Sequence, residues 1–247
     1  MAAGGRVGHD PKTVRYFEEH TPDYGVGRLG LALDFVRRTP GAESLLDVGC
    51  GTGAKLAQIA ADTPLRGLHG LDPSARSLER ARERVECTTH VGSILDDEVV
   101  ASLPRDFDFV LIASVLHHLI GRTRRASYAL AAQALRAAVG LLRPGGHLIV
   151  LEPVYAPALA MDAVFYLKKG VSSVSDRRVS LFGSTWNNIG APVVSYFTNE
   201  RLEALVRGAG MPIVEREIEP LPLPAPVGAF LRKTYTTLIA GPAGAAA

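Results

Sequence analysis

Gly49, Gly51 and Gly53 alternate with other residues directly after a short apolar run. Glycine adopts positive φ without strain and lets a ligand approach the backbone closely. Good helix formers at helical spacing follow at 54–61, so the turn also leaves the N-terminus of a helix open to a ligand. A strand, a glycine turn and a helix in this order predict a nucleotide-type binding site.

Two kinds of nucleotide cofactor are compatible with this turn. Gly49, Gly51 and Ala54 have the spacing of the dinucleotide-binding motif, and Asp72 follows near the distance expected of a carboxylate that binds a ribose. A carboxylate at the end of a strand can accept hydrogen bonds from a pair of hydroxyls. The alternative for Asp72 is structural, as the cap of a helix that begins near Ser74.

Strands and helices alternate along the chain around this turn. This alternation requires parallel strands joined by right-handed crossovers, with helices on both faces of the sheet. The pattern therefore predicts an α/β fold. The expected strands are 44–48, 67–71, 88–91, 107–113, 147–151, 213–218 and 230–239, and the expected helices are 54–61, 74–85, 124–142 and 199–208.

The regular pattern breaks at 154–197, which we expect to be largely irregular. This segment holds 7 of the chain's 16 aromatic residues, where an even spread predicts about 3. Two interpretations stay open: a satellite core packed on the edge of the sheet, and a cap over a substrate pocket.

Charge and composition exclude several classes of protein. The 27 basic and 25 acidic residues give a formal net charge of +2, and 47% of the residues are hydrophobic. These values exclude a disordered protein and a polycationic nucleic-acid binder. Two cysteines, no leading apolar run of signal-peptide length and no apolar run near the ~18 residues of a membrane span indicate a cytoplasmic protein that does not insert into membranes.

Four motifs in the same order resemble the class I S-adenosylmethionine-dependent methyltransferases. They are the turn from Asp47 to Gly53, the strand-ending Asp72, Ser114 to Leu119, and Leu142 to Gly146. The resemblance implies a Rossmann-like, doubly wound sheet of seven strands, mostly parallel with the last strand antiparallel. It also implies a single methyltransferase domain over 1–247, with an N-terminal lid at 1–35 and a substrate-cap insertion at 154–197.

The resemblance also implies the residues of a cofactor site for S-adenosyl-L-methionine. Asp72 would bind the ribose hydroxyls, and Ser93 stands where family members often carry an acidic residue for the adenine, with Asp96 as a substitute. No metal is expected. The implied cofactor residues are Tyr16, Asp47, Gly49, Cys50, Gly51, Gly53, Asp72, Pro73, Ser93, Ile94 and Ser114.

Catalytic and substrate residues are expected near the same edge of the sheet. His117 and His118 follow the fourth strand, where a base would assist methylation of a hydroxyl or an acidic carbon. The alternative for both is a packing or cofactor-loop role. Tyr155, Phe165 and Trp186 in the aromatic segment are predicted to contact the substrate.

The stretch after the fourth strand bears on the class of substrate. Base-modifying nucleic-acid methyltransferases commonly carry an Asn-Pro-Pro-Tyr type motif there, whereas this chain has Ala113 to Leu116. We therefore expect a small organic acceptor resembling a secondary metabolite, with neither nucleic acid nor membrane as partner. The alternatives are a non-methylating protein on the same scaffold and an NAD-dependent dehydrogenase; the oligomeric state is left open.

Overall fold

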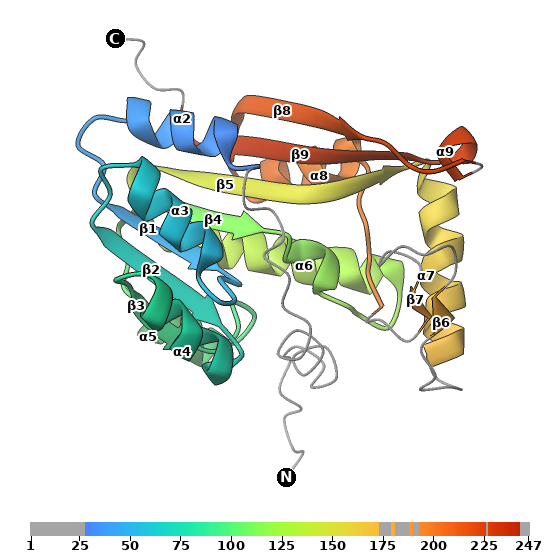
Figure 1. The fold of residues 1–247 in the computed structure, drawn as a ribbon, viewed down its shortest axis with the longest axis horizontal. Helices are drawn as coiled ribbons and strands as arrows, with labels where there is room; N and C mark the ends of the chain where they lie inside the picture. Colours follow the sequence, from blue (N-terminus) through green and yellow to red (C-terminus); the bar gives the residue numbers. More distant parts are fainter. Residues whose placement is uncertain (1–27, 173–178, 181–187, 190–192, 226, 243–247) are drawn as a thin grey trace.

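The computed structural model describes residues 28–172, 179–180, 188–189, 193–225 and 227–242. Its centre is a seven-stranded sheet with helices on both faces (Figure 1). The strands of this sheet are β1 (Ser44–Val48), β2 (Gly67–Asp72), β3 (Thr88–Val91), β4 (Phe107–Ala113), β5 (Leu142–Ala156), β8 (Ile213–Leu221) and β9 (Arg232–Ala240). The two-residue strands β6 (Val179–Ser180) and β7 (Asn188–Ile189) form a separate pair.

The strand order is β3-β2-β1-β4-β5-β9-β8. Strands β1 to β5 pair in parallel, whereas β9 is antiparallel to both β5 and β8. The predicted seven-stranded, doubly wound sheet with an antiparallel last strand is confirmed. The carboxyl ends of β1, β2, β4 and β5 therefore meet at one edge of the sheet, where α/β proteins bind ligands.

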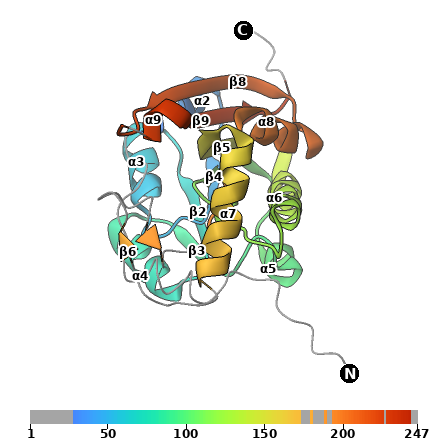
Figure 2. The same ribbon diagram turned by 90° about the vertical axis from the view of Figure 1, so that its right-hand side faces the viewer.

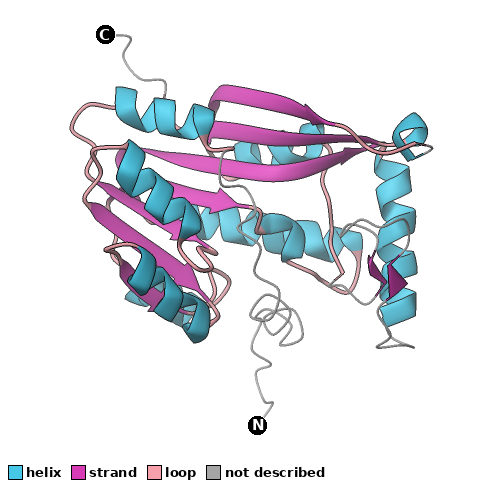
Figure 3. Cartoon of the chain, in the orientation of Figure 1, coloured by secondary structure: helices cyan, strands magenta, loops and turns pink. Residues whose placement is uncertain are grey.

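Two apolar layers hold the sheet between its helices (Figure 3). On one face Leu33 of α2, Leu56 of α3 and Leu78 of α4 belong to one buried cluster. On the other face Leu135 of α6 and Leu202 of α8 belong to the second cluster. The helices are α2 (Gly30–Arg38), α3 (Ala54–Asp62), α4 (Ala75–Arg84), α5 (Asp97–Ser102), the 3-10 helix η1 (Leu116–His118), α6 (Arg124–Val139), α7 (Ala158–Ser172), α8 (Asn199–Gly208) and α9 (Val227–Phe230).

The segment 154–197 differs from the largely irregular stretch that was expected. Its first residues continue β5, because β9 pairs with β5 as far as Ala156. Helix α7 follows and stands across the end of the sheet (Figure 2). Its buried residues include Met161 and Phe165, one turn apart, but exposed Leu159 and Leu167 obscure the helical period in the sequence.

Helix α2 occupies the last part of the predicted lid at 1–35. Leu29, Leu33 and Val36 are buried against the sheet, so these residues belong to the body of the domain. Residues 1–27 of the predicted lid, Tyr16 included, lie outside the described residues. Within the part of the chain that the structure describes, no helix has the length and apolar character needed to cross a membrane.

Candidate active site

The glycine turn joins β1 to α3 at the carboxyl edge of the sheet. Its three glycines have φ values of +73°, +53° and +74° at Gly49, Gly51 and Gly53. A Cβ on Gly49 would collide with Val115, and one on Gly53 would lie 2.9 Å from the Cβ of Ala81, whereas a Cβ on Gly51 meets nothing within 4 Å. Two glycines thus allow close packing inside the protein, and Gly51 faces open space where a ligand can lie.

Asp72 connects the end of β2 to this turn. Its Oδ2 accepts a hydrogen bond from the Gly51 amide at 2.9 Å, and its Oδ1 accepts one from the Ser74 amide at 2.9 Å. The N-cap of α4 is Ser74, whose hydroxyl accepts from the Ser77 amide at 3.1 Å. Because Ser74 fills the capping role, Asp72 is positioned at the turn itself.

Asp47 lies fully buried on β1 beside the turn. Neither of its carboxylate oxygens has a hydrogen-bond partner among the described residues. Burial raises the pKa of Asp47 to about 7, although the nearby Lys55 opposes this effect. Buried polar groups in native proteins nearly always have partners, so this carboxylate points to a ligand that supplies donors.

This raised pKa makes stability depend on pH. The folded state holds the Asp47 proton more tightly than the unfolded chain, so stability falls as pH rises from about 4 through about 7. In the ligand-free protein we expect Asp47→Asn to raise the free energy of unfolding by roughly 2–4 kcal/mol at pH 8 and far less at pH 4. Urea unfolding at both pH values measures this. A difference in the free energy of unfolding between variant and wild type that does not change with pH would contradict this prediction. An equally large difference in the exposed control Asp34→Asn would contradict it too.

The predicted adenine residues occupy the loop after β3. Ser93 is buried and its hydroxyl oxygen accepts from the Leu95 amide at 3.2 Å. Ile94 is buried in the apolar cluster. Asp96 caps α5 by accepting from the amides of Glu98 and Val99, which makes it a poor substitute for Ser93.

Cys50 and Pro73, two further predicted cofactor residues, adjoin the turn and Asp72. Cys50 is buried, and burial raises the pKa of its thiol, which makes it unreactive. Pro73 follows Asp72 and is half-buried.

Glu152 on β5 fixes the loop that carries the two histidines. Its Oε1 accepts from the amides of Val115 and Leu116 at 2.9 and 2.7 Å, and its Oε2 lies 2.6 Å from Nδ1 of His117. Burial raises the pKa of Glu152 to about 8, although the amides favour its charged form. This residue was missed from the sequence, where its only signal is a carboxyl group directly after an apolar strand.

The two predicted catalytic histidines have different surroundings. His117 is buried, and its burial, together with the charge of Lys233, lowers its pKa to about 3. It is therefore a neutral, weakly basic ring whose hydrogen bond with Glu152 suits it to hold the loop in place. His118 is half-buried and packs on His117 with ring centroids 3.9 Å apart. A titration of activity in the ordinary histidine range is not expected from His117.

Hydroxyl groups and rings line the edge beyond the histidine loop. Ser114 has a φ of +62°, a strained value for a residue with a side chain, and its Oγ lies 2.9 Å from the hydroxyl of Tyr235. The rings of Tyr155 and Tyr196 lie 4.3 Å apart, and that of Tyr196 lies 5.2 Å from that of His117. The structure thus brings Tyr155 close to the site and adds Tyr196 and Tyr235.

The other predicted substrate residues are not in this group. Phe165 has no exposed surface and packs under the cations of Arg124 and Lys169, at 5.8 and 5.5 Å from its ring centroid. Such packing is typical of a satellite core, so its contact with a substrate stays a prediction. Trp186 lies outside the described residues.

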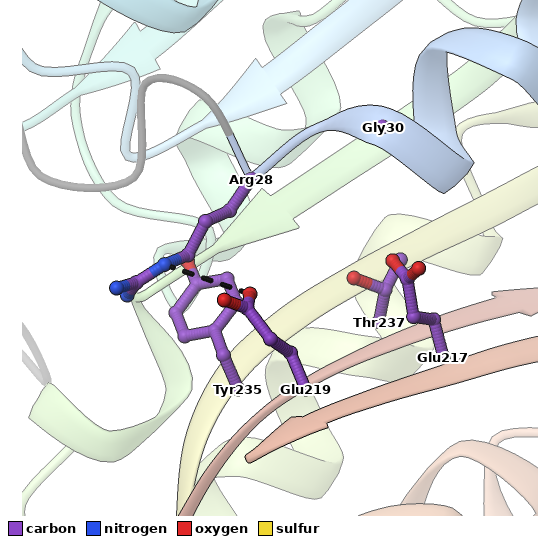
Figure 4. A pocket seen from close by; sticks show the side chains of 6 residues that line it. All are labelled: Arg28, Gly30, Glu217, Glu219, Tyr235 and Thr237. Atoms are coloured by element: carbon purple, nitrogen blue, oxygen red, sulfur yellow. Dashed lines mark ion pairs between the residues drawn. The ribbon is translucent and has the colours of Figure 1, made fainter. Parts of the chain in front are cut away.

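A shallow pocket of about 250 Å³ adjoins Tyr235 where α2 meets the face of β8 and β9 (Figure 4). The guanidinium carbon of Arg28 lies 5.0 Å from the centre of the Tyr235 ring, and its Nε lies 3.7 Å from Oε2 of Glu219. The remaining lining residues are Gly30, Glu217 and Thr237.

Known proteins are similar to this chain in sequence. Residues 46–148 match the family model described as a methyltransferase domain. The chain is 35% identical over 148 residues to an uncharacterized 37.1 kDa protein of Streptomyces fradiae, covering 58% of this chain and 39% of that protein. It is 34% identical over 142 residues to a dTDP-3-amino-3,4,6-trideoxy-alpha-D-glucopyranose N,N-dimethyltransferase of Streptomyces venezuelae, covering 57% and 54%. The chain spans less than two thirds of the length of either relative.

Solved structures share the fold. The N-methyltransferase NodS of Bradyrhizobium japonicum, determined with S-adenosyl-L-homocysteine, superimposes with a TM-score of 0.58 over 95% of this chain and 100% of that one. Sequence identity is 17%, so this likeness shows the architecture alone.

Proposed function

We propose that this chain, which contains a methyltransferase domain of the class I fold, transfers a methyl group from S-adenosylmethionine to a small organic acceptor. The observation that carries the proposal is Asp47, a fully buried carboxylate without a partner among the described residues, beside the open space at Gly51. The positively charged amino-acid part of this cofactor supplies the donors that such a carboxylate requires.

The residues around the turn fit the rest of the cofactor. The carboxylate of Asp72 accepts the amides of Gly51 and Ser74, and because a carboxylate has several acceptor positions it would also accept the two ribose hydroxyls. The hydroxyl hydrogen of Ser93 remains able to donate to the adenine while its oxygen accepts from Leu95. Together with the backbone at Gly51, these groups would hold the nucleoside at the carboxyl edge of the sheet.

S-adenosylmethionine, when bound, supplies a methyl group already activated by a positively charged sulfur. The protein therefore has to position the acceptor and keep water away rather than activate the methyl group. Glu152 holds the backbone at Val115 and Leu116, which fixes one wall of the site. Ser114 and His118 lie at the same edge, where a side chain can receive the proton of a hydroxyl or amine acceptor.

A small acceptor is favoured by the names of two similar proteins and by the surface of the site. One relative is named for an amino-sugar nucleotide, and NodS is named as an N-methyltransferase. The edge beyond the histidine loop holds the half-buried ring of Tyr196, packed on the buried ring of Tyr155, and such a ring suits a flat or apolar body. The near-neutral charge of the chain gives little attraction to a nucleic-acid backbone.

Asp72→Ala tests the cofactor site. We expect the variant to lose roughly 2–3 kcal/mol of binding free energy for S-adenosylmethionine, because two ribose hydroxyls lose a charged acceptor. Titration calorimetry measures the affinity, and Asp34→Ala on the exposed face of α2 serves as the control. Equal affinities in the variant and the wild type would contradict the assignment.

A second measurement separates methyl transfer from the alternatives. Release of S-adenosylhomocysteine in the presence of an acceptor identifies a methyltransferase, whereas cofactor binding without release in an acceptor screen favours a non-methylating protein on this scaffold. Binding of NAD in place of S-adenosylmethionine would indicate the dehydrogenase.

A further inference from the structure

Lys233 places a positive charge at the edge of the sheet where the histidine loop lies. It is half-buried near the start of β9, opposite Tyr155 in the β5–β9 register. Its ammonium lies 5.6 Å from the centre of the Tyr155 ring. No carboxylate pairs with it among the described residues, so its charge is available to a ligand.

The charge of Lys233 lies near the histidine loop. The ammonium lies 5.6 Å from the Tyr155 ring, which lies 4.3 Å from that of Tyr196. The Tyr196 ring in turn lies 5.2 Å from that of His117, whose low pKa the charge of Lys233 helps to produce. The pKa of Lys233 itself is lowered by burial and by the charge of Arg28.

Arg28 is the second cation. Its guanidinium lies over the ring of Tyr235 (Figure 4). The hydroxyl of Tyr235 contacts Ser114. The one ion pair of Arg28 among the described residues is with Glu219 at 3.7 Å, and the two side chains are 39% and 52% exposed. Exposed pairs of this kind contribute little, so Glu219 only partly offsets the two positive charges.

The other titratable groups nearby are two tyrosines, the buried Glu152 and, beside Arg28, Glu217 and Glu219. The pKa values of Tyr155 and Tyr235 are raised by burial, so both phenols are neutral. Glu152 is buried behind the histidine loop, where its Oε1 accepts from the amides of Val115 and Leu116 and its Oε2 lies 2.6 Å from Nδ1 of His117. Two cations, tyrosine rings and hydroxyl donors therefore share this edge.

We propose that Lys233 and Arg28 bind a negatively charged group of the acceptor, a carboxylate or phosphate, while its apolar body lies beside the half-buried ring of Tyr196. The inference rests on the proposed function, because it places the acceptor beside the methyltransferase cofactor site. Lys233 is the principal anion-binding group, and Arg28 adds a second donor from the start of α2.

Fluorine NMR with two matched probes tests the inference. We expect the protein saturated with S-adenosylhomocysteine to bind 4-fluorobenzoate at least about 5-fold more tightly than 4-fluorobenzyl alcohol, because only benzoate forms charge-assisted hydrogen bonds with the cations. Lys233→Met keeps the length of the side chain and should abolish the preference, and Lys233→Arg should retain it. 4-Fluorophenyl phosphate, compared with 4-fluorophenol, repeats the test for a phosphate group.

Lys169→Met is the matched control. Lys169 also lies over a ring, that of Phe165, but it belongs to α7 and donates to the carbonyls of Gly121 and Arg122. Its variant should retain the preference for the anion. Equal binding of both members of each probe pair by the wild type, or an unchanged preference in Lys233→Met, would overturn the inference.

The calorimetric affinity for S-adenosylhomocysteine, measured in the same samples, distinguishes a failure of the anion-binding assignment from a failure of the proposed function. Absence of an anion preference in the wild type, with intact cofactor binding, overturns only the assignment of Lys233 and Arg28. Failure of the wild type to bind S-adenosylhomocysteine overturns the proposed function itself.

Discussion

A Gly51→Val variant is expected to lose S-adenosylmethionine binding by more than about 100-fold while remaining folded. The backbone at Gly51 has a φ of +53°, which a β-branched residue resists, and an added side chain would extend into the open space beside the turn. The effect should fall on the ligand, because a Cβ at this position meets no protein atom within 4 Å.

Gly41→Val provides the control for backbone strain. Gly41 has a φ of +72° and open space around its Cβ position, but it lies in the turn before β1, at the opposite end of that strand. The two variants should lose similar stability in thermal unfolding, and only Gly51→Val should lose the cofactor in calorimetry. Equal cofactor binding by both variants would show that no ligand lies at Gly51.

Glu152→Ala is expected to destabilise the protein by about 3–5 kcal/mol, because it leaves buried donors without an acceptor. The amides of Val115 and Leu116 and the Nδ1 of His117 all face this carboxyl group. Glu152→Gln keeps an oxygen for the two amides and should lose much less stability. Chemical unfolding gives these values.

Glu203→Ala is the matched comparison. Glu203 is also largely buried, but its partners are the exposed guanidinium groups of Arg207 and Arg216 on the far side of the domain. Its replacement should have the smaller effect, since those partners return to water. Similar losses at Glu152 and Glu203 would mean that the histidine loop does not depend on Glu152.

The parts of the fold that follow from local pattern could be predicted from the sequence. The strands 88–91 and 107–113 and the helix 199–208 have the predicted limits, because apolar runs, helical spacing and turn residues are local signals. The glycine turn and Asp72 could also be predicted. Each follows a strand, and the two strands, β1 and β2, are neighbours in the sheet, so the turn and the carboxylate meet at one edge.

Features that depend on long-range register could not be predicted. Glu152 reaches the histidine loop only because β4 and β5 pair with Ala113 opposite Leu151. Tyr196 joins the site because the Ser195 amide donates to the carbonyl of His117 at 2.8 Å. Neither contact has a local signature in the sequence.

The extent of burial also differs between aromatic residues of the same segment. Phe165 and Tyr196 both belong to the aromatic segment, yet Phe165 is fully enclosed and Tyr196 is half-buried beside His117. Composition alone cannot distinguish these two environments, since both favour large apolar side chains.

The close packing of Gly49 against Val115 links two parts of the site that are far apart in the sequence. Movement of the turn toward the histidine loop would displace the loop, and movement of the loop toward the turn would displace the turn. Any ligand that orders the turn therefore also slows opening of the loop, and by thermodynamic reciprocity a rigid loop tightens binding at the turn. Amide hydrogen exchange at Val115 and Leu116 should accordingly become slower on cofactor binding, although neither residue is among those expected to touch the cofactor.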